Sequence, residues 1–522
     1  MLTTNNGGSR MLDNLLNVIK TEGVSEQLYH GLVGVEVEEN RVDKKGQLSR
    51  EPHPQMLGSR SFHPYLQTDY AETQAELITD PNPNIGGVLD QLDTLQTVLY
   101  RSLQGEDRIW PLSMPPRVTA SDVDYIKAHF NRPAYADYRD YLTKKYGVCP
   151  KIMTGVHLNY SIPDPVINRL YAHYENEFSR VTDFRNALYF RMAQNLVLNR
   201  WLITYLFGAS PVAEKGFFDT VPEGLSHPVR SIRNSHFGYA NLPDDGVDAT
   251  IYQSLPHFID RLSDLIATKK LYSRAEFYGP VRLRGADRLN ELSTKGVRYL
   301  EFRCLDLMPF RSNGISRHAL YLMKLLFIYA LVTPVDDEQI VAKLEQAEQD
   351  NERVALEDPM QATFKAADGQ RFFKRLHELA VELKAHSELI NAIDDFAEVI
   401  THPELTPAAK LVSHLDDQNS LMTFGVQQAT AWKAQRVGTE DLLPRMPRLS
   451  ANAQELIFRA VQLGIRYYAV RDEHGAIMLM LTFNSITQVI EADRVSDEPA
   501  TEYLKRMFPD LPLPDVNSDR AI

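Results

Sequence analysis

The chain has 522 residues and a formal net charge of −13, and its composition, 43% hydrophobic and 24% charged, is that of a folded globular protein. The acidic balance argues against a general nucleic-acid or anionic-membrane surface, although it is compatible with a local basic pocket for phosphate. Only two cysteines occur, Cys149 and Cys304, which excludes a disulfide framework and a CxxC metal site and favours a cytoplasmic location.

Membrane segments are not expected. Residues 1–71 contain no signal-peptide core. The longest apolar run, residues 319–332, is interrupted by Lys324 and is too short to span a bilayer. We therefore interpret this run as a buried helix.

Four stretches of the chain alternate between polar and apolar residues, as strands with two different faces do. In the first, residues 35–42, Glu36 and Glu38 fall on one face and Val35 and Val37 on the other. The later stretches are 71–78, 155–161 and 299–304, and alternation groups Glu72, Gln74 and Glu76 in one, His157, Asn159 and Ser161 in the next, and Glu301 and Arg303 in the last. The pattern predicts one antiparallel sheet with an apolar face on a core and a polar face lining a site.

The polar face predicts a hard cation. Carboxylate oxygens with a single imidazole and no thiolate suit Mg²⁺ or Mn²⁺ better than zinc, and such ions usually enter sites that handle phosphate. Any one of these strands taken alone is better explained by half-exposure, with its acids merely solvated. Four together, with a histidine and an arginine in phase, favour a site.

Helical spacing of apolar residues predicts helices between and after these strands. Their ranges are 11–19, 88–103, 120–146, 165–207 (one broken helix or two), 257–271, 316–332, 336–350 (acidic and expected to be solvated), 370–400 and 406–414. A basic segment at 277–288 carries Arg282, Arg284 and Arg288. These arginines suit either a solvated face or a pocket for a phosphate chain.

The composition changes near Pro444 and Pro447. A helix is predicted over 451–463, and a hairpin over 465–470 and 476–483 around the turn at 472–475. The last 30 residues are acidic and are expected to be loose. The sequence thus predicts a large body, 1–445, and a small α/β appendage, 446–522.

Familiar nucleotide and nucleophile motifs are absent. The chain contains no GxxxxGK[ST], no GxGxxG after a strand and no GxSxG. Any nucleotide must therefore be bound in another way.

Several stretches together resemble the bacterial type of glutamate–cysteine ligase, also called γ-glutamylcysteine synthetase. They are GVEVEENRV (34–42), GSRSFHPYLQTDYAETQAELIT (58–79), RIWPLSMPP (108–116), TGVHLNYSIP (154–163), YLFGASPVAE (205–214), PVRSIRNSHFGYAN (228–241), EFYGPVRLRG (276–285) and YLEFRCLDLMPF (299–310). The set is most similar to the N-terminal ligase half of the fused bifunctional glutathione-synthesising enzymes. Residues 449–470 resemble the linker that leads there into an ATP-grasp domain, for which no room follows in this sequence, so we expect γ-glutamylcysteine formation only.

The resemblance implies an α+β, glutamine-synthetase-like fold, in which a curved antiparallel sheet flanked by helices carries metals on its concave face. It also implies ATP-dependent joining of the γ-carboxylate of L-glutamate to the amine of L-cysteine through a γ-glutamyl phosphate. The implied partners are these small molecules and ATP, with Mg²⁺, or Mn²⁺ as the alternative. Nucleic acid and membrane are not expected, and monomer and dimer both stay open.

The resemblance also implies roles for individual residues. The metal ligands would be Glu36, Glu38, Asp69, Glu76, His157 and Glu301. Arg303 and Glu38 would act in catalysis, and Arg282, Arg284 and Thr154 would contact ATP. The cysteine substrate would be bound by Arg233, Tyr239 and Tyr278 at its main-chain end and by Tyr70, Tyr138 and Leu142 at its thiol. Simple alternatives are a turn cap for Asp69, packing for the tyrosines and surface ion pairs for Arg282 and Arg284.

Other functions compatible with the residues are a ligase of this fold with another amine acceptor, a non-catalytic binding partner, and a hydrolase with paired carboxylates. The first is open because an apolar pocket discriminates weakly among small side chains. The intact carboxylate cluster argues against a silent partner.

Overall fold

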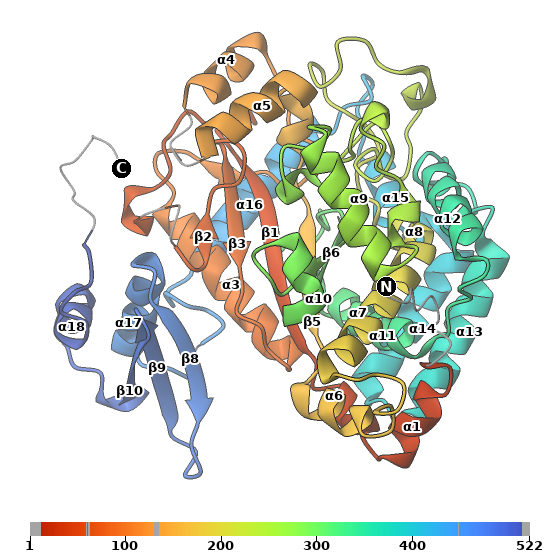
Figure 1. Ribbon diagram of the computed structural model, residues 1–522. Coiled ribbons are helices and arrows are strands. Elements are labelled where there is room, and N and C mark those ends of the chain that lie inside the picture. Colours follow the sequence, from red (N-terminus) through yellow and green to blue (C-terminus); the bar gives the residue numbers. More distant parts are fainter. Residues whose placement is uncertain (1–11, 59, 61–62, 130–134, 447, 514–522) are drawn as a thin grey trace.

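The computed structural model describes residues 12–58, 60, 63–129, 135–446 and 448–513. Figure 1 shows a large body, with strands at its centre and helices around them, and a smaller unit of three strands and two helices beside it. Among the described residues, no helix combines the length and the apolar composition that crossing a lipid bilayer requires.

A seven-stranded antiparallel sheet forms the centre of the body. Its strand order is β2 (Leu66–Gln67), β3 (Gln74–Ile78), β1 (Leu32–Val42), β5 (Val156–Ser161), β7 (Tyr299–Leu305) and β6 (Val281–Arg284), and β4 (Arg108–Ile109) also pairs with β1. The four strands predicted from alternation are therefore neighbours in one antiparallel sheet, which confirms that prediction.

The two faces of the sheet differ as expected. Val35 and Val37 of β1, Leu158 of β5 and Phe302 of β7 are buried in the main hydrophobic core. The other face carries the polar residues, because side chains alternate across a strand. One expectation is wrong: β3 begins only at Gln74, so Glu72 lies in the preceding turn, where its carboxylate pairs with Arg60.

Three helices cover the apolar face: α3 (Ile85–Ser102), α7 (Val181–Leu198) and α11 (Arg317–Val332). Ser316 caps the start of α11 by accepting a hydrogen bond from the Ala319 amide at 3.1 Å. Phe327 of α11 stacks on Tyr160 of β5, with 4.5 Å between the ring centres. The apolar run is thus a buried helix, as predicted, and its Lys324 donates to the Pro83 carbonyl oxygen.

An outer layer of helices packs behind these, formed by α8 (Arg200–Phe207), α12 (Ile340–Ala355), α13 (Ala366–Glu382) and α14 (Ser387–Thr401). The prediction of a solvated helix near 336–350 is wrong. Ile340, Leu344, Ala347 and Val354 repeat every three to seven residues on one side of α12 and are buried.

Three long predicted helical stretches are interrupted. The stretch 370–400 forms the two helices α13 and α14. The stretch 165–207 forms α6 (Asp164–Tyr171), α7 and α8, with a turn whose Tyr174 and Phe178 pack on Phe184. The stretch 120–146 forms α4 (Ala120–Ala128) and α5 (Ala136–Tyr146), and residues 130–134 lie outside the described part. The remaining helices are α1 (Leu15–Thr21), α2 (Ser25–Leu28), α9 (Leu255–Ala267), α10 (Leu292–Lys295), α15 (Pro407–Val412) and α16 (Met422–Val437).

The C-terminal unit contains α17 (Ala451–Gln462), β8 (Arg466–Arg471), β9 (Ile477–Phe483), β10 (Ile486–Glu491) and α18 (Ala500–Met507). The predicted hairpin is β8 and β9. A third strand pairs with β9, and Leu504 of α18 is fully buried, so the expectation of a loose end is wrong for this helix. Residues 514–522 lie outside the described part.

The C-terminal unit is tied to the body by hydrogen bonds. The Tyr467 amide donates to Tyr65 Oη at 3.1 Å, and Gln462 Nε2 donates to Ser102 Oγ at 2.9 Å. Tyr65 Oη also donates to Asp80 at 2.6 Å. The unit and the body share one hydrophobic core cluster.

Candidate active site

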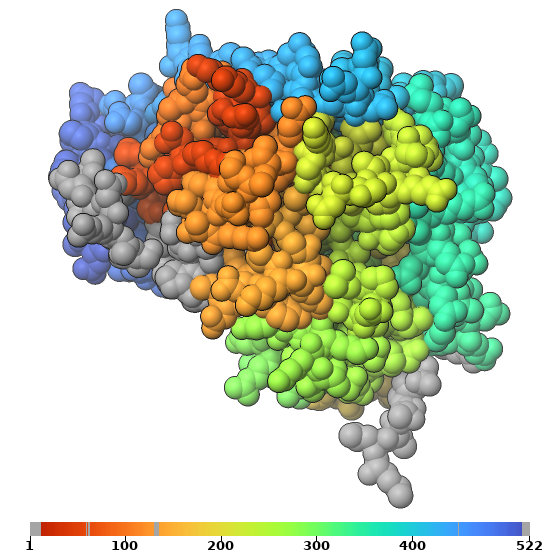
Figure 2. Space-filling model, turned by 90° about the horizontal axis from the view of Figure 1, so that it is seen from above, coloured from red at the N-terminus to blue at the C-terminus, as the bar shows by residue number. Residues whose placement is uncertain are grey.

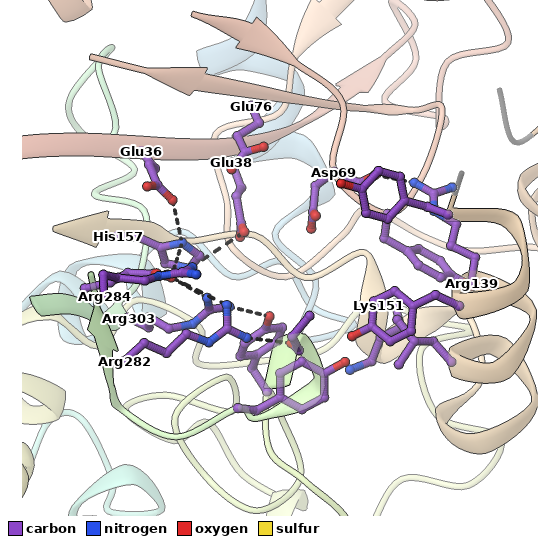
Figure 3. Close-up of a pocket in the computed structure, with 18 residues that line it drawn as sticks. Glu36, Glu38, Asp69, Glu76, Arg139, Lys151, His157, Arg282, Arg284 and Arg303 are labelled. Atoms are coloured by element: carbon purple, nitrogen blue, oxygen red, sulfur yellow. Dashed lines mark hydrogen bonds and ion pairs between the residues drawn. The ribbon is translucent and has the colours of Figure 1, made fainter. Parts of the chain in front are cut away.

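A cavity of about 260 Å³ opens on the polar face of the sheet. Figure 3 shows the side chains that line it. They include every site residue expected from the sequence except Thr154 and Arg233, together with four that were not expected, Tyr135, Arg139, Lys151 and Ala275.

Acids gather at the β1 side of this cavity. Glu38 of β1 stands directly opposite Glu76 of β3, and Glu36 stands opposite His157 of β5. His157 Nδ1 lies 3.4 Å from Glu36 Oε2, and its Nε2 lies 3.6 Å from Glu38 Oε1. Asn159, from the same face of β5, donates to Glu36 Oε1 at 2.8 Å.

For both Glu36 and Glu38, burial raises the pKa and the neighbouring His157 lowers it. Burial raises the pKa of Glu38, with His157 partly opposing it. For Glu36 burial also favours the neutral acid, but the hydrogen bond and charge of His157 prevail and lower its pKa. The cluster therefore concentrates negative charge that bulk water does not solvate.

Glu301 joins this acidic cluster to three arginines. It pairs with Arg303 on its own strand, with Arg282 across the ladder to β6 at 3.7 Å, and with Arg284. Burial would raise the pKa of Glu301, but the three guanidinium groups lower it well below its usual range. Burial lowers the pKa of Arg282, with the neighbouring Arg303 adding to the effect. This half of the cavity can neutralise an anion.

The acidic cluster has the chemistry of a divalent-metal site. One ligand atom from each of Glu36, His157 and Glu301 lies within 4.8 Å of the other two. The buried Nε2 of His157 has no hydrogen-bond partner among the described residues. Oxygen-rich ligands with one imidazole fit a hard cation, so the residues present are suited to Mg²⁺ or Mn²⁺.

Tyrosines form the wall beyond the arginines. Arg303 donates to Tyr239 Oη at 2.6 Å, and the Tyr239 ring lies 4.7 Å from that of Tyr278. Burial raises the pKa of both phenols, so they stay protonated. Lys151 lies against the same rings.

The outer rim combines apolar and cationic groups. Tyr70 and Leu142 are buried in a small cluster against which Tyr138 packs. The Arg139 guanidinium lies 4.9 Å from the centre of the Tyr70 ring and donates to the Asp69 carbonyl oxygen.

Two expected site residues stand behind the cavity wall. Thr154 is fully buried, and its hydroxyl donates weakly to the carbonyl oxygens of Leu112 and Ser113 at 3.4 and 3.5 Å. Arg233 is buried against Asp306, with 3.6 Å between charged atoms, and its ring-stacking partner is Tyr239. Their predicted contacts with substrate stay predictions.

Sequence reasoning did not find Lys151 and Arg139. Lys151 gave one signal, since it is a lone cation in the otherwise apolar run 148–153, directly before the His157 strand. Arg139 lies on a helix rich in charged residues, and nothing in its neighbours distinguishes it from a solvated arginine.

The fold and the site define an α+β protein whose antiparallel sheet carries a metal-type carboxylate cluster beside a basic pocket. The family model for glutamate–cysteine ligase matches residues 16–273 and 265–354. The chain belongs to the glutamate–cysteine ligase family.

Individual relatives agree with this assignment. The glutathione biosynthesis bifunctional proteins GshAB of Pasteurella multocida and Streptococcus mutans are each 33% identical to this chain, over 90% and 89% of its length. The matches cover 61% and 60% of those proteins, so the chain spans about three fifths of the length of the relatives it matches.

Solved structures agree as well. A crystal structure of a bifunctional glutathione synthetase from Pasteurella multocida superposes with a TM-score of 0.81 at 30% identity, covering 91% of this chain and 61% of the other. A glutamate–cysteine ligase from Francisella tularensis, solved in complex with AMP, has a TM-score of 0.70 at 22% identity, covering 83% of this chain and 92% of the other, and supports the fold alone.

Proposed function

We propose that this protein is an ATP-dependent ligase that joins the γ-carboxylate of L-glutamate to the amine of L-cysteine through γ-glutamyl phosphate. Membership of the glutamate–cysteine ligase family supports the reaction class. The observation that carries the proposal is the sharing of Glu301 between an acidic metal-type cluster and three arginines in one cavity. Phosphoryl transfer needs this combination of cation ligands and anion-neutralising groups.

In this proposal the acidic side of the cavity holds two or three Mg²⁺ ions, with Mn²⁺ as the alternative. Their ligands are Glu36, Glu38, Asp69, Glu76, His157 and Glu301, among which Glu38 bears most directly on catalysis. Ions held by these ligands would supply positive charge against the negative charge that develops during phosphoryl transfer.

The arginines bind the phosphate chain. Arg303 neutralises the phosphoryl group as it moves to glutamate, and its hydrogen bonds to Glu301 and Tyr239 fix the orientation of its guanidinium. Arg282 and Arg284 contact the phosphates of ATP. Thr154 supports the nucleotide side through the backbone of residues 112–113. Most of the rate enhancement then comes from positioning and charge stabilisation.

The acceptor amino acid binds at the tyrosine side of the cavity. Tyr239 and Tyr278 hold its main-chain end, with Arg233 supporting Tyr239 from behind. Tyr70, Tyr138 and Leu142 form the pocket for the thiol. Because an apolar pocket separates small side chains only weakly, another small amine acceptor is the second candidate.

The same proposal includes the finer architecture. The sheet is arranged as in glutamine synthetase, with its metals on the concave face. Residues 1–445 form the catalytic domain, and residues 446–522 form a unit that corresponds to the linker of the fused enzymes.

ADP release by the purified protein tests the proposal, measured with Mg²⁺, ATP and L-glutamate, with and without L-cysteine. We expect cysteine-dependent turnover that chelation abolishes. Turnover with another small amine alone would change the substrate. No turnover with any amine would contradict the ligase and favour a non-catalytic binding role.

A further inference from the structure

Lys151 is a buried cation in the cavity that the roles proposed above do not use. It ends a short 3-10 helix, Cys149–Lys151, ahead of β5, and its side chain is 5% exposed. Its Nζ lies 3.7 Å from the centre of the Tyr278 ring, 4.1 Å from that of Tyr146 and 5.3 Å from that of Tyr239. Among the described residues, no carboxylate pairs with this ammonium and no oxygen accepts a hydrogen bond from it.

Lys145, which also lies over the Tyr146 ring, differs in its partners. Its Nζ lies 2.7 Å from Glu276 and 2.7 Å from Asp245, and 5.2 Å from the centre of the Tyr146 ring. Burial opposes its charge, but the hydrogen bonds to Asp245 and Glu276 prevail and raise its pKa. Lys145 thus pairs with Asp245 and Glu276, whereas Lys151 makes no ion pair within the described part of the chain.

The environment of Lys151 favours its neutral form. Burial lowers the pKa of Lys151 to about 7; Asp69 and Glu276 oppose the shift, and Arg303 and Lys145 add to it. The surrounding phenols do not compete with Lys151 as proton acceptors, since burial raises the pKa values of Tyr146, Tyr239 and Tyr278 and keeps them protonated. A cation bound at the acidic cluster would lower the pKa of Lys151 further.

The position of Lys151 matches the position of the acceptor. Figure 3 places Lys151 on the side of the cavity away from Glu36 and His157, near Arg139. Phosphoryl transfer is assigned to the acidic and arginine side, so the amine must approach from the tyrosine side. The amine of an amino acid is protonated near neutral pH, and only its neutral form has the electron pair that attacks a carbonyl carbon.

We propose that Lys151 is the general base that deprotonates the amine of the incoming acceptor. The inference rests on the function proposed above. It assigns to one residue the deprotonation of the acceptor amine at the tyrosine side of the cavity. The roles proposed for the acids and for the permanently charged arginines do not include this step.

Neutral Lys151 takes one proton from the acceptor ammonium and becomes an ammonium. The freed amine forms the C–N bond to the γ-carbonyl carbon, and the C–O bond to phosphate breaks with its electron pair on the phosphate. The second proton of the amine goes to the departing phosphate. Lys151 returns its proton to solvent when the products leave.

The test uses Lys151→Arg with two acceptors. Arginine keeps a positive charge and can lie over the tyrosine rings, but it stays protonated and cannot act as a base. With L-cysteine we expect kcat/KM to fall by about 100-fold or more, the usual contribution of a general base. With hydroxylamine, which is already neutral at pH 7, we expect Lys151→Arg to stay within a few-fold of the unmodified protein.

The pH profile gives a second readout. For cysteine, the acidic limb of kcat/KM in the unmodified protein should follow Lys151, with a pKa near 7. In Lys151→Arg the limb should move up to the pKa of the acceptor amine itself. Lys144→Gln is the matched control, because it removes an exposed lysine of α5 that does not line the cavity, and it should leave the limb unmoved.

Three outcomes overturn the inference. Full cysteine activity with an unchanged pH profile in Lys151→Arg would mean that only the positive charge matters. Equal loss with cysteine and hydroxylamine, in a variant that unfolds at the normal temperature, would mean a positioning role. If Lys151→Arg does not fold, Lys151→Gln is measured in the same way. No turnover of the unmodified protein with either amine overturns the proposed function itself.

Discussion

Glu38 of β1 and Glu76 of β3 are directly opposed on neighbouring antiparallel strands, on the face that lines the cavity. Like charges at such positions destabilise a sheet, and burial of Glu38 increases the cost. His157 Nε2, 3.6 Å from Glu38, compensates for one charge at most. In the proposed metal site a cation bound between the two acids would relieve this repulsion and would link the stability of the sheet to metal binding.

Glu38→Gln should therefore separate function from stability. We expect turnover with cysteine to fall by roughly 100-fold or more. Removal of a group that only hydrogen-bonds to a metal ligand already lowers metal affinity or activity by up to about 100-fold. The temperature of unfolding without metal should stay the same or rise, because a repulsive charge is removed. Turnover and thermal unfolding of the same preparation measure both. Near-normal activity would contradict the assignment of Glu38 as a ligand.

Mg²⁺ or Mn²⁺ alone should stabilise the folded protein. A ligand that binds only the native state at 100 times its Kd adds about 2.7 kcal/mol to the free energy of unfolding. We expect a rise in the unfolding temperature on adding either ion and its reversal by chelation. Glu38→Gln should show a much smaller rise, and Glu26→Gln, a change on the distant helix α2 (Ser25–Leu28), should show the full one. An equal rise in both variants would place the metal elsewhere.

Glu301→Gln should destabilise the protein at neutral pH. It leaves Arg303, Arg282 and Arg284 without their shared acid, and loss of one partner of a buried pair costs about 3 kcal/mol. The folded-state pKa of Glu301 lies below the ordinary value of 4.5, so its stabilisation is present above 4.5 and is lost as the pH falls toward the folded-state value.

Denaturant unfolding of Glu301→Gln and the unmodified protein at several pH values measures this effect. The difference in free energy of unfolding should narrow on acidification. A difference that stays constant from neutral pH down would indicate a packing effect and would contradict the electrostatic explanation.

Glu39 should have the opposite pH dependence. It lies on the core side of β1, accepts a hydrogen bond from Gln96 Nε2 at 2.7 Å, and its pKa is raised by burial to about 8. Because the folded-state pKa is above the unfolded value of 4.5, its contribution to stability is fully present below 4.5 and is lost as the pH rises through about 8.

Glu39→Gln should remove this loss. We expect the variant to gain about 3.5 kcal/mol on the unmodified protein in going from pH 5 to pH 8, a value set by the linkage between pKa and stability. Unfolding curves at the two pH values measure it. Parallel stability of both proteins over this range would mean that Glu39 is ionised in the fold.

Alternation of residue types along single strands was enough to predict the polar face of the sheet. Glu36 and Glu38, His157, and Glu301 with Arg303 were grouped correctly, because a strand sends alternate side chains to opposite faces whatever its neighbours. Glu72 was misplaced because alternation does not locate where a strand begins. The acidic helix near 336–350 was taken as solvated because charge hid its buried row of Ile340, Leu344 and Val354.

Resemblance of the motifs to a known family supplied the substrates and most residue roles, which no local pattern contains. The sequence by itself thus determined the strands, their polar faces and the family. Only the tertiary structure decided which strands are neighbours, that Thr154 and Arg233 stand behind the cavity wall, and that Lys145 has acids where Lys151 has only rings. Those facts depend on contacts between segments that are far apart in the chain. Strand pairing, side-chain burial and pKa values are set by such spatial neighbours, which the sequence alone does not identify.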